Sequence, residues 1–331
     1  MFRIDDLKEL NTFLSVNSSN EYVDTFCYGN KIRLVSNSTE LFACLILDAQ
    51  SSENQEDFSF RLNTKLLKSL DSGNSVVLED SEDKIKMSFY GENDTFYFRS
   101  VFTKQAVFDT TYSDKLRLLG RGTTNAFESD SIFDLAKIAK IFHSFVCVDS
   151  GVASVILDSG PRIYKKVSYH DTFALTGEVF SDLRKCNHVF ANVGSYIISE
   201  RGNLSLIARK VIAYENTEYA LLHSVKYGAK CIAEINLARL IVFFKKTRIK
   251  IDRIHVCVAE KSVKVEGFNS EFTIPVFIKV MELAEGASMS DFNIPSAVLF
   301  GFFSSLSEYQ FVLKQKKSFT QLEQGDITIV W

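Results

Sequence analysis

Three well-separated stretches of the chain have apolar residues at intervals of three and four, with polar residues between them. This spacing predicts amphipathic helices that turn one face to a core. Asp5, Asp130 or Ser131, and Asn236 stand at the expected starts and are residue types that cap helices. The three predicted helices cover Asp6–Val16, Ser131–His143 and Asn236–Thr247.

A second helix signal follows each of the first three. Asn63 and Asn293 are suitable caps, and Pro295 suits the first turn of a helix. Alternating apolar and polar residues before and after these segments predict strands. The second set of predicted helices covers Asn63–Leu70, Glu178–Asn187 and Pro295–Leu306.

Between the two helices of each unit, the sequence repeats a strand, a polar tip and a second strand. Gly267 and Asn269 in the third copy suit a tight turn or a bulge. The copies share their pattern more than their residues. They cover Lys31–Leu45, Arg162–Leu175 and Ser262–Val276.

Each unit is therefore predicted to run strand, helix, strands, helix, strands. A period of roughly a hundred residues exceeds the 20 to 50 residues of solenoid repeats, so each copy should be a domain with its own core. We expect an α+β chain of three β-rich domains with two helices each. The predicted domains are residues 1–122, 123–226 and 227–331.

Composition agrees with a folded chain. Hydrophobic residues make up 46% of it, 29 of its residues are Phe and only three are Pro, which argues against disordered segments. No apolar run approaches the roughly 20 residues of a membrane span, and no targeting signal is visible at Met1. The six cysteines lack the spacing of metal ligands, so we expect reduced thiols and a cytoplasmic protein.

Common catalytic motifs are missing from the sequence. It has no phosphate-binding loop, no Gly-x-Ser-x-Gly elbow and no His-Glu-x-x-His. The isolated Gly177 is expected in a turn, and the pairs His143 with Cys147 and Cys186 with His188 lack further ligands at suitable spacing. We expect no enzyme activity, no metal and no cofactor. The acidic cluster Asp80, Glu82 and Asp83 is expected to form a solvated hairpin tip. His170 and Asp171 have the right types for acid/base catalysis but no nucleophile beside them in the sequence.

Basic residues gather on the predicted helices, away from the apolar stripes. The whole chain is acidic, with a formal charge of −3, so positive charge is segregated onto one class of element. A solvated helix face would explain any single pair. Repetition on equivalent helices favours sequence-independent contacts with the phosphates of a polyanion. The residues expected to make these contacts are Lys65, Lys68, Lys137, Lys140, Arg184, Lys185, Lys245 and Lys246.

The order of elements and the three repeated strand pairs resemble those of the DNA sliding clamps, most closely the bacterial beta-clamp type of DNA polymerase processivity factor. The resemblance covers nearly the whole chain. It implies the DNA-clamp fold, in which two chains close head to tail into a ring lined by helices. It also implies double-stranded DNA, which the basic side chains named above would face independently of sequence. A DNA polymerase and a clamp loader are the other implied partners, and the ring would slide on DNA without catalysis.

Clamps of this type bind short hydrophobic peptides between their second and third domains. By position in the chain, the resemblance assigns Phe173, Val330 and Trp331 to that pocket. This sequence lacks the Met-Pro-Met ending of bacterial clamps, which suggests a phage or mobile-element version. The predicted helix Pro295–Leu306 has no Lys or Arg, so it suits an interface as well as a DNA-facing wall.

Two alternatives stay open. One is a clamp-like scaffold or monomeric polymerase accessory protein that does not encircle DNA. The other is an enzyme with an interdomain site, in which His170, Asp171 and Cys147 would converge.

Overall fold

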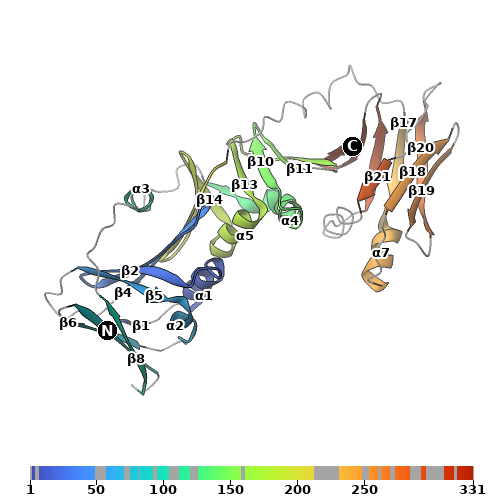
Figure 1. Ribbon diagram of the computed structural model, residues 1–331. Coiled ribbons are helices and arrows are strands. Elements are labelled where there is room, and N and C mark those ends of the chain that lie inside the picture. Colours follow the sequence, from blue (N-terminus) through green and yellow to red (C-terminus); the bar gives the residue numbers. More distant parts are fainter. Residues whose placement is uncertain are drawn as a thin grey trace. The chain divides into compact units, whose positions relative to one another are not determined.

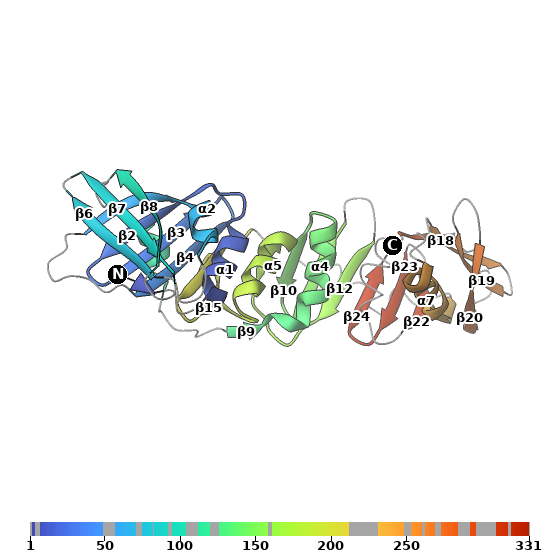
Figure 2. The ribbon, with the colours of Figure 1, turned by 90° about the horizontal axis from the view of Figure 1, so that it is seen from below.

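The computed structural model contains three repeats with a similar order of strands (Figures 1 and 2). Two helices are described in each of the first two repeats, apart from the connecting α3, and one, α7, is described in the third. The described residues are 2–3, 7–48, 57–70, 75–81, 83–91, 95–103, 112–119, 126–157, 161–211, 231–247, 253–259, 262–268, 273–283, 292–295, 309–316 and 319–330.

The first repeat has β1 (Phe2–Arg3), α1 (Leu7–Val16), β2 (Tyr22–Tyr28), β3 (Lys31–Asn37), β4 (Leu41–Asp48), β5 (Phe58–Asn63), α2 (Thr64–Lys68), β6 (Ser75–Ser81), β7 (Lys84–Tyr90) and β8 (Phe96–Thr103), followed by the connecting α3 (Ser113–Leu116). The second has β9 (Ala126–Glu128), a 3-10 turn (Ser129–Ile132), α4 (Phe133–Ile141), β10 (Phe145–Asp149), β11 (Val152–Ile156), β12 (Arg162–Lys166), β13 (Phe173–Thr176), α5 (Gly177–Cys186), β14 (Val189–Val193), β15 (Tyr196–Arg201) and β16 (Leu204–Arg209). The third has β17 (Cys231–Asn236), α7 (Ala238–Thr247), β18 (Arg253–Ala259), β19 (Ser262–Phe268), β20 (Thr273–Leu283), β21 (Phe292–Pro295), β22 (Gln310–Gln315), β23 (Thr320–Gln324) and β24 (Ile327–Val330).

The helices bury the stripes that their sequences predict. In α4 the buried positions are Leu135, Ala136, Ile138 and Ala139, spaced so that they share one face. This face packs on β10 and β11, and α1 packs in the same way on β4 (Figure 1). These two helices therefore each cover one face of a sheet.

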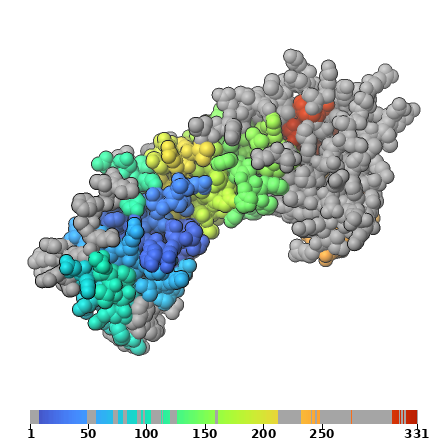
Figure 3. Space-filling model, in the orientation of Figure 1, coloured from blue at the N-terminus to red at the C-terminus, as the bar shows by residue number. Residues whose placement is uncertain are grey.

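All strand pairs within the sheets are antiparallel among the described residues. One sheet has the order β5-β2-β3-β4-β16-β15-β14-β9, and another begins β13-β10-β11-β12-β24-β23-β22-β17. In both sheets, the fourth strand of the first half of one repeat pairs with the last strand of the following repeat. The blue atoms of the first repeat and the yellow atoms of the second adjoin in Figure 3 where β4 pairs with β16.

The chain divides into two compact units. The first contains Met1–Ser129 and Asp182–Lys210, and the second contains Asp130–Ser181 and Val211–Trp331. Both units take strands from the second repeat, because its last strand pairs with β4 and its β12 pairs with β24. The division into domains 1–122, 123–226 and 227–331 stays a prediction.

Two of the predicted caps are confirmed. The Oδ1 atom of Asn63 accepts a hydrogen bond from Lys65 N at 2.8 Å, and that of Asn236 accepts one from Ala238 N at 2.9 Å. The cap expected at Asp130 or Ser131 is wrong. Both residues lie in the 3-10 turn, and the N-cap of α4 is Ile132, which makes no side-chain capping bond. Hydrogen bonds between residues three apart in such a turn satisfy backbone groups that a capping side chain would otherwise bind.

Two of the three repeated strand pairs are hairpins. β3 pairs with β4, and β19 pairs with β20. The second copy is not a hairpin, because β12 pairs with β11 and β24 while β13 pairs with β10. The residues form two strands as expected, but alternation along a strand does not specify its partner.

The expected helix start at Pro295 is also wrong. Pro295 is the last residue of β21, paired with Arg253, and β21 is the end strand of its sheet. Proline lacks an N–H group and is tolerated on edge strands for that reason. Residues 296–306 of the predicted helix lie outside the described residues.

Candidate nucleic-acid interface

The predicted DNA-facing side chains lie on α2, α4, α5 and α7. Lys137 and Arg184 are half-buried. The exposed members of the set are Lys65, Lys68, Lys140, Lys185, Lys245 and Lys246.

The short helix α2 is fixed from both ends. Thr64 is buried, and its N–H donates to Glu21 O at 2.9 Å. The Ser69 hydroxyl donates to Leu66 O at 2.7 Å at the other end. Thr64 and Leu67 face inward, so Lys65 and Lys68 are left on the exposed side. Neither lysine forms an ion pair with a described residue.

Helix α4 carries two lysines in different electrostatic settings. Lys137 Nζ lies 3.6 Å from Asp134 Oδ1 and 4.2 Å from the centroid of the Phe133 ring. Lys140 is exposed and has no ion pair among the described residues. A carboxylate neighbour reduces the field that a DNA phosphate would meet, so Lys140 is the stronger candidate contact.

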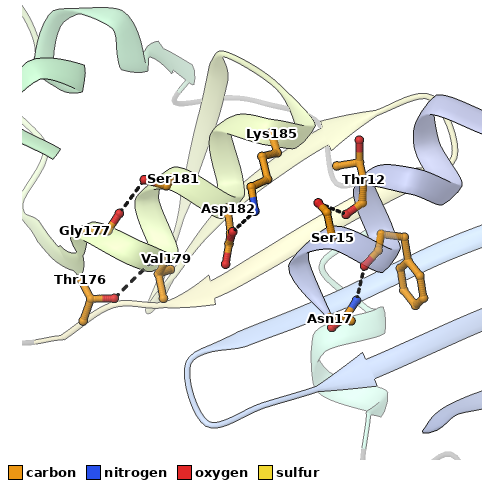
Figure 4. A network of polar contacts seen from close by, with 10 residues as sticks. Thr12, Ser15, Asn17, Thr176, Gly177, Val179, Ser181, Asp182 and Lys185 are labelled. Carbon is orange, nitrogen blue, oxygen red and sulfur yellow. Dashed lines mark hydrogen bonds and ion pairs between the residues drawn. The ribbon is translucent and has the colours of Figure 1, made fainter. Parts of the chain in front are cut away.

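Helix α5 shows the same arrangement near its end. Lys185 Nζ donates to Asp182 Oδ1 at 2.7 Å, one turn earlier on the helix (Figure 4). Thr176 Oγ1 accepts a hydrogen bond from Val179 N at 3.3 Å and so caps the start of α5. The start of the helix is therefore capped, but Lys185 near its end is already partly neutralised by Asp182.

The start of α5 packs closely on the end of α4. A Cβ atom at Gly177 would lie 2.1 Å from the backbone nitrogen of Lys140, so only glycine fits there. His143 Nδ1 lies 2.8 Å from Glu178 Oε1 and ties the same two helix ends together. The expectation that Gly177 lies in a turn is wrong, because it is the first residue of α5 and permits this close approach.

In α7, Lys245 is engaged and Lys246 is not. Lys245 Nζ donates to the Tyr309 hydroxyl at 3.0 Å and lies 5.5 Å from the centre of that ring. Lys246 is exposed without an ion pair to a described residue. Within the described part of the chain, Lys65, Lys68, Lys140 and Lys246 thus form no ion pair, whereas Lys137, Lys185 and Lys245 are held by neighbouring side chains.

Sequence reasoning missed Arg201, at the end of β15. Its Nη2 donates to Thr12 Oγ1 at 3.1 Å and to Lys8 O at 3.4 Å, both on α1. These partners lie nearly two hundred positions away in the chain, with a separation of 189 for Thr12. No local pattern could have indicated them.

The expected pocket residues do not come together. Strand registers place Phe173 opposite Val148, on the sheet face that also carries Ile163 and Ile329. Val330 pairs with Arg162 and points to the other face, and Trp331 lies outside the described residues. Whether these residues bind a partner peptide stays a prediction.

The face of β12 and β24 that carries Val330 is mixed in chemistry. Val330 packs with Val152 and Tyr164, and Phe319 packs against them. Gln321 is opposite Val330 and only 1% exposed. Its Oε1 has no hydrogen-bond partner among the described residues, whereas its Nε2 donates to Glu323. A buried acceptor of this kind is costly unless a partner satisfies it.

The other candidate chemical groups have ordinary surroundings. Burial raises the pKa of Cys186 to about 11, so it stays a neutral thiol, and its Sγ donates to Ser199 O at 3.4 Å. Cys147 is buried in β10. His170 lies in the loop between β12 and β13, close to Gly151. The described residues contain no cluster of three potential metal ligands, and none of the described helices is long and apolar enough to cross a membrane.

No family model matches the sequence, and no curated protein matches it. Solved structures do match. The DNA polymerase III subunit beta of Pseudomonas aeruginosa has a TM-score of 0.67 at 12% identity, covering 98% of this chain and 96% of that one. A putative DNA polymerase III beta subunit of Eubacterium rectale has a TM-score of 0.67 at 12% identity, covering 98% and 95%. The Helicobacter pylori beta clamp bound to a DNA ligase peptide has a TM-score of 0.61 at 12% identity, covering 98% and 96%. The chain thus has the fold of the DNA polymerase III beta sliding clamps.

Proposed function

We propose that this chain is a sliding clamp that encircles duplex DNA and tethers a DNA polymerase to it. The main support is the presence of exposed lysines on corresponding helices of the repeats in a chain of net charge −3. Such cations attract DNA through its phosphates, independently of sequence. If the ring is closed, these contacts can stay weak, because the topological link keeps the protein on DNA while it slides.

Closure into a ring is proposed to follow the pairing rule seen inside the chain. The last strand of one repeat pairs with the fourth strand of the preceding one, as in β16 with β4 and β24 with β12. Two strands at the equivalent positions are left over: β8, the last strand of the first repeat, and β20, the fourth strand of the third repeat. β8 is the end strand of its sheet, and the first residues of β20 pair with β19 along one edge. A head-to-tail homodimer would pair β8 of each copy with β20 of the other, covering edges that otherwise favour aggregation.

The proposed partners are a DNA polymerase and a clamp loader, which would dock through short peptides. A structural neighbour bound to a DNA ligase peptide supports this kind of partner. The proposed docking site is the face of β12 and β24 around Val330, Tyr164 and Gln321. Phe173 would support this site from the opposite face of the sheet, and the assignment of Trp331, outside the described residues, stays a prediction. We propose a cytoplasmic, non-enzymatic protein.

The ring is tested by its mass in solution and its retention on DNA. Light scattering should give twice the chain mass of 37.5 kDa. For retention, the protein is mixed with linear duplex, so that it can thread over the open ends without a loader. The DNA is then either circularised by ligation or left linear, and both samples are washed with salt. Retention on circles alone supports the clamp, whereas a monomer that salt removes from both forms supports the non-encircling scaffold.

The DNA-facing surface is tested with two lysines of the same helix. Lys140→Ala should weaken binding and reduce the slope of log affinity against log salt by about 0.9, the value for one lost phosphate contact on duplex DNA. Lys137→Ala is the matched control, and its effect should be smaller because Asp134 already neutralises Lys137. The affinity of each variant for a short duplex, measured at a series of salt concentrations, gives both slopes. Equal effects, or a larger effect for Lys137→Ala, would contradict the assignment.

A further inference from the structure

The turn between β15 and β16 lies against the side of α1. Asn203 N donates to Glu9, at 3.2 Å from Oε2 and 3.3 Å from Oε1. Glu9 is only 6% exposed although it carries a carboxylate. A buried carboxylate is tolerated where hydrogen bonds compensate for its lost hydration.

Gly202 makes this approach possible for two reasons. Its φ of +55° is a conformation that glycine adopts without strain. A Cβ atom at this position would also lie 2.0 Å from Glu9 Oε1, well inside van der Waals contact. The turn and the carboxylate therefore fit each other closely.

Arg201, the residue before this turn, reaches two helices. Its Nη2 donates to Thr12 Oγ1 at 3.1 Å and Lys8 O at 3.4 Å on α1. Its Nη1 donates to Lys185 O at 3.5 Å, in the last turn of α5. Carbonyl groups at the end of a helix lack partners within the helix and favour a nearby cation. A single guanidinium thus links α1 to α5, which lie side by side in Figures 1 and 2.

These contacts form a second connection between the first two repeats. The β4–β16 ladder joins the same repeats through the sheet. If the β4–β16 ladder were the only connection, the two repeats could bend relative to each other about the strand axis. A further contact in the helix layer opposes that bending. The angle between the repeats is then determined by both layers.

We propose that Glu9 and Arg201 are positioning residues that hold α1 against the end of α5 and so fix the angle between the first and second repeats. The proposed positioning role depends only on the hydrogen bonds described above. Its consequence for DNA rests on the proposed function: a fixed angle keeps the cations of α2 and of the end of α5, which belong to the same compact unit, at a constant spacing along the duplex.

Arg201→Lys and Glu9→Gln test the proposal. The lysine retains the charge but has no planar fork to reach both helices, and the glutamine retains the size without the charge. Hydrogen exchange of the α1 amides should be about tenfold faster or more in both variants, since local opening becomes easier. Exchange in α4 should not change. Arg209→Lys, at the exposed end of β16, is the matched control and should leave α1 unchanged.

The DNA consequence is measured separately, as the half-life on ligated circles after the salt wash. Arg201→Lys should shorten it several-fold despite an unchanged net charge, and Arg209→Lys should not. Unchanged exchange in α1 for both Arg201→Lys and Glu9→Gln would overturn the positioning role. If wild-type protein is not retained on circles, the clamp function fails, while the exchange data still decide the positioning role. If Glu9→Gln does not fold, Arg201→Lys decides it.

Discussion

The two ladders that join neighbouring repeats share one backbone plan but differ in their side chains. At β4–β16, the face away from α1 carries Phe42, Cys44 and Ile207. At β12–β24, the corresponding face carries Tyr164 and Val330, and the buried Gln321 adjoins it from β23. The first face buries an apolar cluster, although Ser205 lies opposite Cys44 on it, whereas the second face includes a buried amide.

The chain itself covers the first of these faces. Tyr112, Leu116, Leu118 and Leu119, from the segment that follows β8, pack against its apolar cluster. The Tyr112 hydroxyl donates to Asp24 Oδ2 at 2.6 Å and fixes the segment in place. The second face holds an unsatisfied buried acceptor instead. Strand pairing therefore joins the repeats in both places, while the outer side chains determine whether a junction is covered by the chain itself.

The largest expected effect comes from breaking the sealed junction. Phe42 is 1% exposed and lies in the cluster that the connecting segment covers. Phe42→Ala should destabilise the first unit by about 3–5 kcal/mol, since it removes a buried ring and leaves a cavity. Chemical denaturation monitored by hydrogen exchange of β2 to β4 measures this. A loss below about 1 kcal/mol would show that the face is not a packed core.

A smaller effect is expected from releasing the connecting segment. Tyr112→Phe removes the hydrogen bond to the Asp24 carboxylate and should cost about 1–2 kcal/mol. Limited proteolysis should then cut near residues 112–119 faster than in wild type. Tyr196→Phe is the matched control, because Tyr196 packs against the same cluster from β15. Equal cleavage of both variants would mean that the hydroxyl bond does not hold the segment.

The smallest effect on stability is expected at the mixed junction. Gln321→Leu removes the unsatisfied acceptor together with the contact to Glu323, so stability should change by less than about 1 kcal/mol. Stimulation of a DNA polymerase on a primed circle should nevertheless fall, if this face receives the polymerase peptide. Full stimulation by the folded variant would show that Gln321 is not part of the docking site.

Local features of this fold could be predicted from the sequence. Apolar spacing located α1, α2, α4, α5 and α7, and the side chains of Asn63 and Asn236 act where capping chemistry places them. Long-range features could not be predicted. The pairing of β12 with β11 and β24, and the contacts of Arg201 with α1, depend on residues distant in the chain.

The candidate site shows the same limit. Helix periodicity located the lysines, but it could not show that Asp134 and Asp182 partly neutralise two of them. Nor could it show that Phe173 and Val330 lie on opposite faces, since this depends on the register across four strands.

Encircling of DNA is tested most directly by cutting a circle that already carries the protein. The protein is threaded onto linear duplex, the DNA is closed by ligation, and the washed complex is split into two halves. One half is cut at a single site and the other is left closed. A closed ring should be released rapidly after the cut and persist on the closed circle. Equal retention on cut and closed DNA would contradict this expectation, because it would show that local contacts rather than a ring hold the protein in place.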